Sequence, residues 1–201
     1  MKKIFEPDVN FGEVNATLQS GTVLIYPTET CYGIGCDSTV QTAVEKVFAI
    51  KGRDTQKPCI LLFSDLEMLR KYAQFDPVIE QKVFPHWPGA LTVLLPAKEN
   101  TDLSPLVISS EGKIACRISP YPFIRKLFET FDHPLVSTSA NLSGAANIYE
   151  ASEIEHVFEG REISADIFID AGDLPVCPPS TLIEIKNGVV TVLRQGTITL
   201  S

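Results

Sequence analysis

The sequence has no long apolar run and no surplus of basic residues, and both absences exclude classes of protein. No hydrophobic stretch approaches the ~20 residues that a membrane-spanning helix needs, so we expect no contact with a membrane. The 17 Lys and Arg residues are outnumbered by 25 Asp and Glu, which gives a net charge of −8. This balance argues against a general nucleic-acid or membrane-surface binder but leaves room for a local basic cleft.

Cysteine and histidine are also scarce. The five cysteines are odd in number and lie mostly within apolar runs, which favours reduced thiols in the core over a disulfide framework. Cys31 and Cys36 do not have a zinc-ligand spacing, and the three histidines are scattered, so we predict no metal site built from side chains. Met1–Lys3 is not followed by the apolar region of a signal peptide. We therefore expect a cytoplasmic protein.

Three common catalytic or nucleotide-binding motifs are missing. The chain contains no GxxxxGK[ST] loop, and Gly33-Ile34-Gly35 lacks the third glycine of a dinucleotide fingerprint. No GxSxG elbow is present, which leaves little support for a serine hydrolase. Any bound nucleotide must be held in another way.

Apolar, β-rich runs alternate with helical patterns along the first half of the chain. We expect strands at Thr22–Tyr26, Cys59–Phe63, Ala90–Leu95, Lys113–Ser119, Leu135–Thr138, Ile167–Asp170, Thr181–Ile185 and Val189–Arg194. Asn187-Gly188, between the last two, is a strong hairpin signal. These patterns predict one α/β domain spanning residues 1–201, with a mixed sheet.

The expected helices have recognisable start signals. One precedes Gly21, and a second is predicted from a capping box at Ser38 and Gln41 to about Lys51. Ser64 and Asp76 are predicted N-caps of two more, and Phe123–Phe131 forms another. The "PTETCYGIG" segment is expected to be a loop, His86–Gly89 a packed turn, and Thr101–Ser110 a loop that could cover a site.

Lys51, Arg53 and Lys57 follow one helix within seven residues, and two interpretations fit them. Basic side chains complement the dipole at a helix C-terminus. Arginine and lysine together also suit a polyphosphate, because the guanidinium forms paired hydrogen bonds and the ammonium adds a mobile charge. The residues alone leave both readings open.

A polar run, "STSANLSG", follows the strand at Leu135. It is either a turn at the strand end or a cradle for phosphate or carboxylate, since ligands bind at strand ends in α/β sheets. Arg117 interrupts an apolar strand and suggests an anionic partner. Arg194 ends the last strand and raises the same question.

These segments occur in a known order. "YPTETCYGIG", "KGR", "WPGALTVLL", "ACRISPYP", "STSANLSG" and "PSTLIEI...VLRQG" together resemble the YrdC-like threonylcarbamoyl-AMP synthase family (TsaC), in its short form without an extra C-terminal domain. The resemblance implies an open, twisted α/β fold (YrdC/RibB-like) around a large concave positive cleft. It also implies a nucleotidyltransferase that makes threonylcarbamoyl-AMP and pyrophosphate from L-threonine, bicarbonate or CO₂, and ATP, for the tRNA-modification proteins downstream.

The resemblance assigns roles by position. It places the L-threonine contacts at Thr30, Arg117, Ser137 and Ser180. It places the ATP contacts at Lys51, Arg53, Lys57, Ser139, Asn141 and Arg194, with Lys51 and Arg53 as the catalytic pair. Mg²⁺ would be carried on the phosphates, and Glu29 is the nearest candidate for a water-mediated contact.

The family pattern is not followed everywhere. Relatives often have Asn where Lys57 stands and His where Leu62 stands, and Ser-Pro-Thr commonly replaces Asn147–Tyr149. Two rivals therefore stay open. One is an RNA-binding module that uses the same basic cleft, which would bind RNA weakly given the acidic composition. The other is a divergent enzyme that adenylates another small carbamoyl or acyl substrate.

Overall fold

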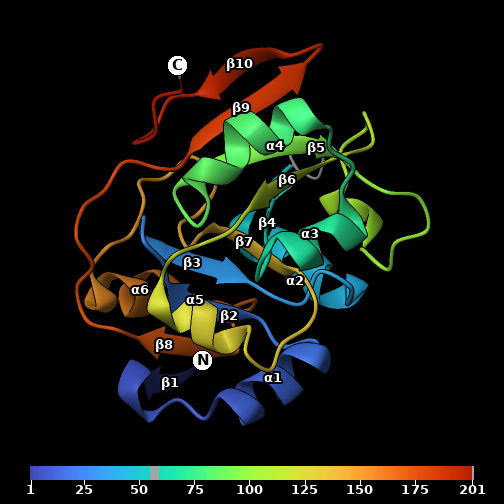
Figure 1. The fold of residues 1–201 in the computed structure, drawn as a ribbon. Coiled ribbons are helices and arrows are strands. Elements are labelled where there is room, and N and C mark those ends of the chain that lie inside the picture. Colours follow the sequence, from blue (N-terminus) through green and yellow to red (C-terminus); the bar gives the residue numbers. More distant parts are fainter. Residues whose placement is uncertain (55–58, 201) are drawn as a thin grey trace.

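The computed structural model describes residues 1–54 and 59–200 and shows a single twisted sheet with helices packed on it (Figure 1). Its ten strands are hydrogen-bonded in the order β1-β8-β2-β3-β7-β4-β6-β5-β9-β10. Their bounds are β1 Lys2–Phe5, β2 Leu24–Pro27, β3 Tyr32–Gly35, β4 Ile60–Leu62, β5 Leu91–Pro96, β6 Lys113–Arg117, β7 Leu135–Ser139, β8 Ile167–Asp170, β9 Thr181–Lys186 and β10 Val189–Arg194.

The sheet is mixed, as the sequence predicted. The pairs β1/β8, β2/β8, β4/β6 and β5/β9 are parallel, and the other five pairs are antiparallel. β9 and β10 form the predicted hairpin, with positive φ at both Asn187 and Gly188, as a two-residue turn of this twist requires.

Helices cover both faces. They are α1 Phe11–Gln19, α2 Gln41–Lys51, α3 Leu66–Tyr72, α4 Pro77–Val83, α5 Pro122–Leu127 and α6 Ala151–Phe158, with short 3₁₀ turns at η1 Glu6–Asp8, η2 Phe84–His86 and η3 Pro105–Val107. No helix in the described ranges is long and apolar enough to cross a bilayer.

Two buried clusters separate the faces of the sheet. On β2, Leu24 and Tyr26 belong to the cluster that contains side chains of α1 and α5, while Ile25 between them belongs to the cluster that contains side chains of α2, α3, α4 and α6. On β4, Leu62 faces the α1/α5 side and Leu61 the other. This is the alternation expected of a strand buried on both sides.

Several local predictions were wrong. Residues Tyr32–Gly35, expected to be loop, form β3 in the middle of the sheet, and Gly35 is required there because an added Cβ would lie 1.7 Å from the carbonyl oxygen of Val136. Ser38 does not cap α2, whose N-cap is Val40 without a side-chain bond. Asp65, not Ser64, caps α3, where its carboxylate accepts from the Met68 amide.

Other predictions were confirmed. Asp76 caps α4 and accepts from the Ile79 amide. Cys31, Cys36, Cys59 and Cys116 are buried free thiols, and Cys177 is a partly buried one. Trp87 packs in a turn, where its indole N–H donates to the Leu91 carbonyl at 2.7 Å. By contrast, the 101–110 segment differs from its prediction as a loop that could cover a site, because Leu103 and Val107 are buried in the core.

The helices leave part of one face open. α1 and α5 cover the α1/α5 side over β8, β2, β7 and β4, where their side chains share a cluster. Farther along the same side, Ala115 of β6 pairs with Leu94 of β5, and Leu94 pairs with Glu184 of β9. These three residues line a cavity. This part of the sheet is therefore the floor of the candidate site.

Candidate active site

The cavity has a volume of about 600 Å³, which suits a ligand of nucleotide size. Its lining comes from segments that are far apart in the chain: the β2–β3 turn, β7, β6, and the β9–β10 hairpin. Seven of the ten residues assigned from the sequence lie in it: Thr30, Arg53, Arg117, Ser137, Ser139, Ser180 and Arg194.

Three arginines meet in this cavity. Arg53 follows α2 directly after Gly52, whose left-handed conformation ends the helix, and its guanidinium donates to the Thr138 hydroxyl at 3.3 Å. Arg117 ends β6 and is only 4% exposed. Arg194 ends β10, and its pKa is lowered by burial and then by the positive charges of Arg117 and Arg53. Such a group of like charges favours a polyanionic ligand.

The cavity lining also contains a lysine whose positive charge is paired with two carboxylates. Lys113 forms ion pairs with Glu111 and Glu184, and these two carboxylates line the cavity too. Leu94, Leu182 and Leu193 also line the cavity. The lining therefore combines an arginine cluster with apolar side chains, the combination that a nucleotide needs.

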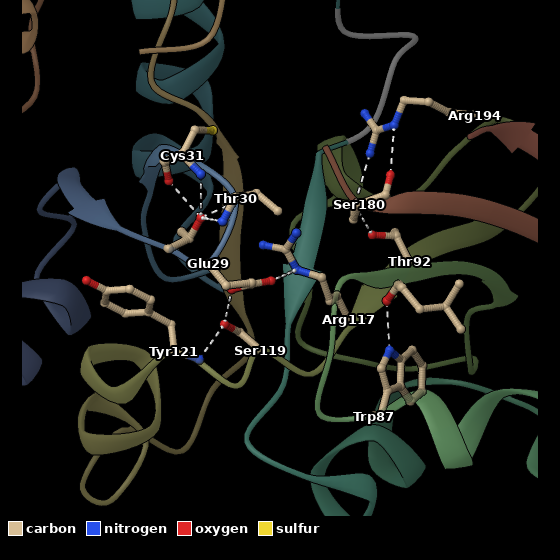
Figure 2. Close-up of polar contacts among 12 residues, drawn as sticks. Glu29, Thr30, Cys31, Trp87, Thr92, Arg117, Ser119, Tyr121, Ser180 and Arg194 are labelled. Carbon is tan, nitrogen blue, oxygen red and sulfur yellow. Dashed lines mark hydrogen bonds and ion pairs between the residues drawn. The ribbon is translucent and has the colours of Figure 1, made fainter. Parts of the chain in front are cut away.

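Ser180 and Arg194 are held together at the end of β9 (Figure 2). Arg194 donates from Nε to the Ser180 carbonyl and from Nη2 to the Ser180 hydroxyl, both at 3.0 Å. The same hydroxyl lies 2.8 Å from the hydroxyl of Thr92 on β5. These contacts fix the direction of the guanidinium.

The β2–β3 turn presents Thr30 to the cavity. The hydroxyl of Thr28 accepts from the amides of Thr30 and Cys31 and donates to the Cys31 carbonyl at 2.7 Å. It also lies 3.0 Å from the Thr30 hydroxyl. The turn is therefore ordered by its own side chain, as in other Ser/Thr turns.

Lys51 and Asn141 lie behind the cavity wall. The Lys51 ammonium is 4% exposed and donates to the carbonyls of Ser139 and Asn141 and to the Asn141 side chain. Burial lowers its pKa to about 8, and the charge of Arg53 adds to this effect. In this state Lys51 orders the polar run after β7 rather than pointing at the ligand space.

The remaining assignments are placed as follows. Lys57 lies outside the described residues. Leu62, where relatives often have His, is fully buried in the α1/α5 cluster, whereas Asn147 lines the cavity. The carboxylate of Glu29 faces Arg117 and Ser119, so it is already engaged where a water-mediated Mg²⁺ contact was expected.

Sequence reasoning missed the residues that support the site. Thr28 and Thr92 each hold a residue of the cavity through a hydroxyl, and Ser119 holds Glu29 beside Arg117, yet none stands out in the sequence. The only available signal was their position, because they fall within the recognised segments "YPTETCYGIG", "WPGALTVLL" and "ACRISPYP". The roles depend on strand order, which a local pattern does not contain.

The sequence model of the Sua5/YciO/YrdC family, described as "Telomere recombination", matches residues 16–196. The chain belongs to the Sua5/YciO/YrdC family. A relative from Photobacterium profundum, named threonylcarbamoyl-AMP synthase, is 37% identical over 191 residues, which cover 93% of this chain and 99% of that protein.

Solved structures of the Sua5/YciO/YrdC family share this architecture. Sua5 of P. abyssi, crystallised with L-threonine, superimposes with a TM-score of 0.83 at 27% identity over 97% of this chain, which spans 57% of that longer chain. YciO of E. coli superimposes with a TM-score of 0.82 at 24% identity and is matched over 97% of this chain and 94% of its own. The expected fold class is confirmed.

Proposed function

We propose that the protein is an L-threonylcarbamoyladenylate synthase. It forms threonylcarbamoyl-AMP and pyrophosphate from L-threonine, bicarbonate or CO₂, and ATP. The relative named threonylcarbamoyl-AMP synthase is matched over nearly its whole length, and the family neighbour Sua5 of P. abyssi was crystallised with L-threonine. The observation that carries the proposal is the convergence of Arg53, Arg117 and Arg194 on one cavity lined with hydroxyls.

The two substrates would occupy different parts of the cavity. L-threonine would lie between the β2–β3 turn and the end of β6, where the Arg117 guanidinium pairs with its carboxylate and the hydroxyls of Thr30, Ser137 and Ser180 surround it. The ATP phosphates would lie against Arg53, Arg194 and Ser139. Lys57 would add a further cation, and Lys51 would act by holding Ser139 and Asn141.

The reaction needs no covalent enzyme intermediate. The neutral amine of threonine attacks CO₂ and loses a proton, which gives a carbamate. A carbamate oxygen then attacks the α-phosphorus of ATP, and the bond to the leaving pyrophosphate breaks. Two anions must approach each other, so preorganised guanidinium groups lower the barrier, by about 3 kcal/mol for each well-placed donor in comparable sites.

Mg²⁺ would arrive with the nucleotide. Among the described residues no group of three or more His, Cys, Asp or Glu side chains converges as a ligand set. Mg²⁺ prefers phosphate oxygens and water to a protein cage, so it would be held by the ATP phosphates and neutralise part of their charge.

The product would serve proteins that modify tRNA, in the cytoplasm where ATP and tRNA are present. Those partner proteins would take the adenylate from this enzyme, so the enzyme itself need not hold tRNA. Weak RNA binding by the cavity is a separate prediction, and it would appear as an affinity that falls steeply with salt and does not require threonine.

Pyrophosphate release tests the proposal directly. Purified protein should release pyrophosphate only when L-threonine, bicarbonate and ATP are all present, and mass spectrometry should detect threonylcarbamoyl-AMP. Serine and glycine in place of threonine test the divergent-enzyme alternative, and discrimination against serine should be about 10- to 200-fold if only the methyl group is sensed. A faster reaction with another amino acid would reject the assignment of threonine.

A further inference from the structure

Glu29 connects two sides of the cavity that are not neighbours in the sheet. It lies in the β2–β3 turn beside Thr30, whereas Arg117 and Ser119 lie at the end of β6, and β7 and β4 separate β3 from β6. One carboxylate oxygen lies 3.5 Å from Nε of Arg117, and the other accepts a 2.5 Å hydrogen bond from the Ser119 hydroxyl (Figure 2). This side chain therefore links the β2–β3 turn to the end of β6, next to the Arg117 that lines the cavity.

A chain of two hydrogen bonds orients one oxygen of the Glu29 carboxylate. The Tyr121 amide donates to the Ser119 oxygen at 3.2 Å, which directs the hydroxyl proton of Ser119 toward Glu29. Hydrogen bonds aligned in this way reinforce one another in a buried setting. The orientation of Glu29 is consequently set by the backbone that follows β6.

The guanidinium of Arg117 has two edges that can face an anion, one at Nε and one formed by the two Nη nitrogens. Its Nε edge faces Glu29 in an ion pair at 3.5 Å, and both Nε and the Glu29 oxygen opposite it are buried with no hydrogen-bond partner in the described part of the chain. The other two guanidinium nitrogens lie on the side of the guanidinium that faces Thr30 (Figure 2). Those nitrogens are the ones available to a ligand carboxylate.

We propose that Glu29 is the positioning residue of Arg117. The Glu29 carboxylate pairs with Nε of Arg117, so the two Nη nitrogens stay directed at the substrate carboxylate. Because Glu29 precedes Thr30 in the turn, the same contact fixes the position of Thr30 relative to Arg117. This inference rests on the proposed function, in which Arg117 binds the carboxylate of threonine. A buried arginine without a counter-ion is costly, so Glu29 also stabilises the charge while the cavity is empty.

Glu29→Gln is the first test. Glutamine keeps the shape of the side chain and can still accept from Ser119, but it has no charge to pair with Arg117. The KM for L-threonine should rise about 10- to 100-fold, the effect of losing a hydrogen bond to a charged group, while the Kd for ATP should change less than about 2-fold. Glu80→Gln, which removes the exposed partner of Arg70 outside the cavity, is the matched control and should leave both constants unchanged.

Comparing the effect of Glu29→Gln in the wild type with its effect in an Arg117→Lys variant tests whether Glu29 acts through Arg117. Lysine keeps the positive charge, but its single ammonium group has no separate Nε–H with which Glu29 could pair. If Glu29 acts through Arg117, its removal should lower kcat/KM for threonine about 10- to 100-fold in the wild type but less than about 3-fold beside Lys at position 117. Ser119→Ala, which keeps the carboxylate and removes its anchor, should give an intermediate loss in a folded protein.

Different results would contradict the positioning role of Glu29 and the proposed synthase activity. Equal losses in both backgrounds, or tighter threonine binding by the Glu29→Gln variant, would overturn the positioning role while leaving the synthase intact. A wild-type protein that neither binds threonine in calorimetry nor releases pyrophosphate would reject the proposed function, and the role of Glu29 with it.

Discussion

Arg194 donates two hydrogen bonds to Ser180, one to the backbone carbonyl and one to the side-chain hydroxyl, each at 3.0 Å. The hydroxyl oxygen of Ser180 therefore accepts from a guanidinium while it lies 2.8 Å from the hydroxyl of Thr92. If Thr92 donates as well, the proton of Ser180 is free to point at the ligand. The contact thus links a proposed phosphate contact to a proposed threonine contact.

Thr92→Val should weaken the use of threonine without loss of stability. Thr92 is fully buried, and valine has nearly the same shape, but it cannot polarise Ser180. We expect kcat/KM for threonine to fall about 3- to 10-fold, the effect of one neutral hydrogen bond. Thr92→Ser should restore it, and an unchanged kcat/KM in Thr92→Val would show that the hydroxyl pair is structural only.

Arg53→Ala and Arg117→Ala should each lower the rate of pyrophosphate release at least ~100-fold, because each removes a charge aimed at an anionic substrate. Far-UV circular dichroism should still show a folded protein. Arg70→Ala, which removes an arginine whose side chain is 53% exposed outside the cavity, serves as the control and should keep full activity. Near-normal turnover in either cavity variant would refute its role.

The sequence was sufficient to predict the fold class and most strands. Ile167–Asp170 and Val189–Arg194 have the predicted bounds, because apolar runs between turn signals are local features. β3 was missed because glycines occupy alternate positions of Tyr32–Gly35, and glycine suggests a turn until the neighbouring backbone is known. The close approach of Val136 explains Gly35, and it exists only in the folded sheet.

The site was only partly predictable for the same reason. Arg194 reaches the cavity through a β-bulge, since Val192 pairs with Ile183 and Arg194 with Leu182, leaving Leu193 as the extra residue. Without that bulge, strict alternation would place Arg194 on the other face of the strand. Lys51 was expected at the phosphates, yet its ammonium is taken by backbone carbonyls that no sequence pattern reveals.

Lys51→Met should disorder the polar run after β7. The substitution leaves the buried carbonyls of Ser139 and Asn141 without a donor, which should cost about 1–3 kcal/mol of unfolding free energy and reduce the affinity for ATP. Urea unfolding and calorimetry measure the two effects.

Ionisation of Lys51 should make the free energy of unfolding increase as pH rises from about 8 to 10.5. The folded-state pKa of about 8 lies below the ordinary 10.5, so the unfolded chain binds more protons between these values. The proton-linked part of the Lys51 contribution to stability therefore rises with pH across that window and is constant and lower below it. The difference in unfolding free energy between wild type and Lys51→Met should widen as pH rises through this range. A constant difference would contradict the assignment.

His133 should make stability depend on pH in the opposite direction. Burial is the largest single effect and lowers its pKa, but the 2.7 Å bond to the buried carboxylate of Asp37 and the negative charges of Asp37, Asp132 and Asp102 together outweigh it, so the net pKa is raised above 6.5. The stabilisation is fully present below the unfolded-state pKa and is lost as pH rises through the raised folded-state pKa.

His133→Gln provides the comparison. Urea unfolding from about pH 6 to about pH 9 should show that wild type loses its advantage over the variant as pH rises. Parallel profiles for the two proteins would mean that the contact between His133 and Asp37 carries no proton-linked stability.

The most direct measurement is a crystal structure of the protein with L-threonine and a non-hydrolysable ATP analogue. We predict that the phosphates contact Arg53 and Arg194 and that the threonine carboxylate contacts the Nη edge of Arg117, with both ligands in the same cavity. Ligands bound elsewhere, or arginines that point to separate surfaces, would contradict the account.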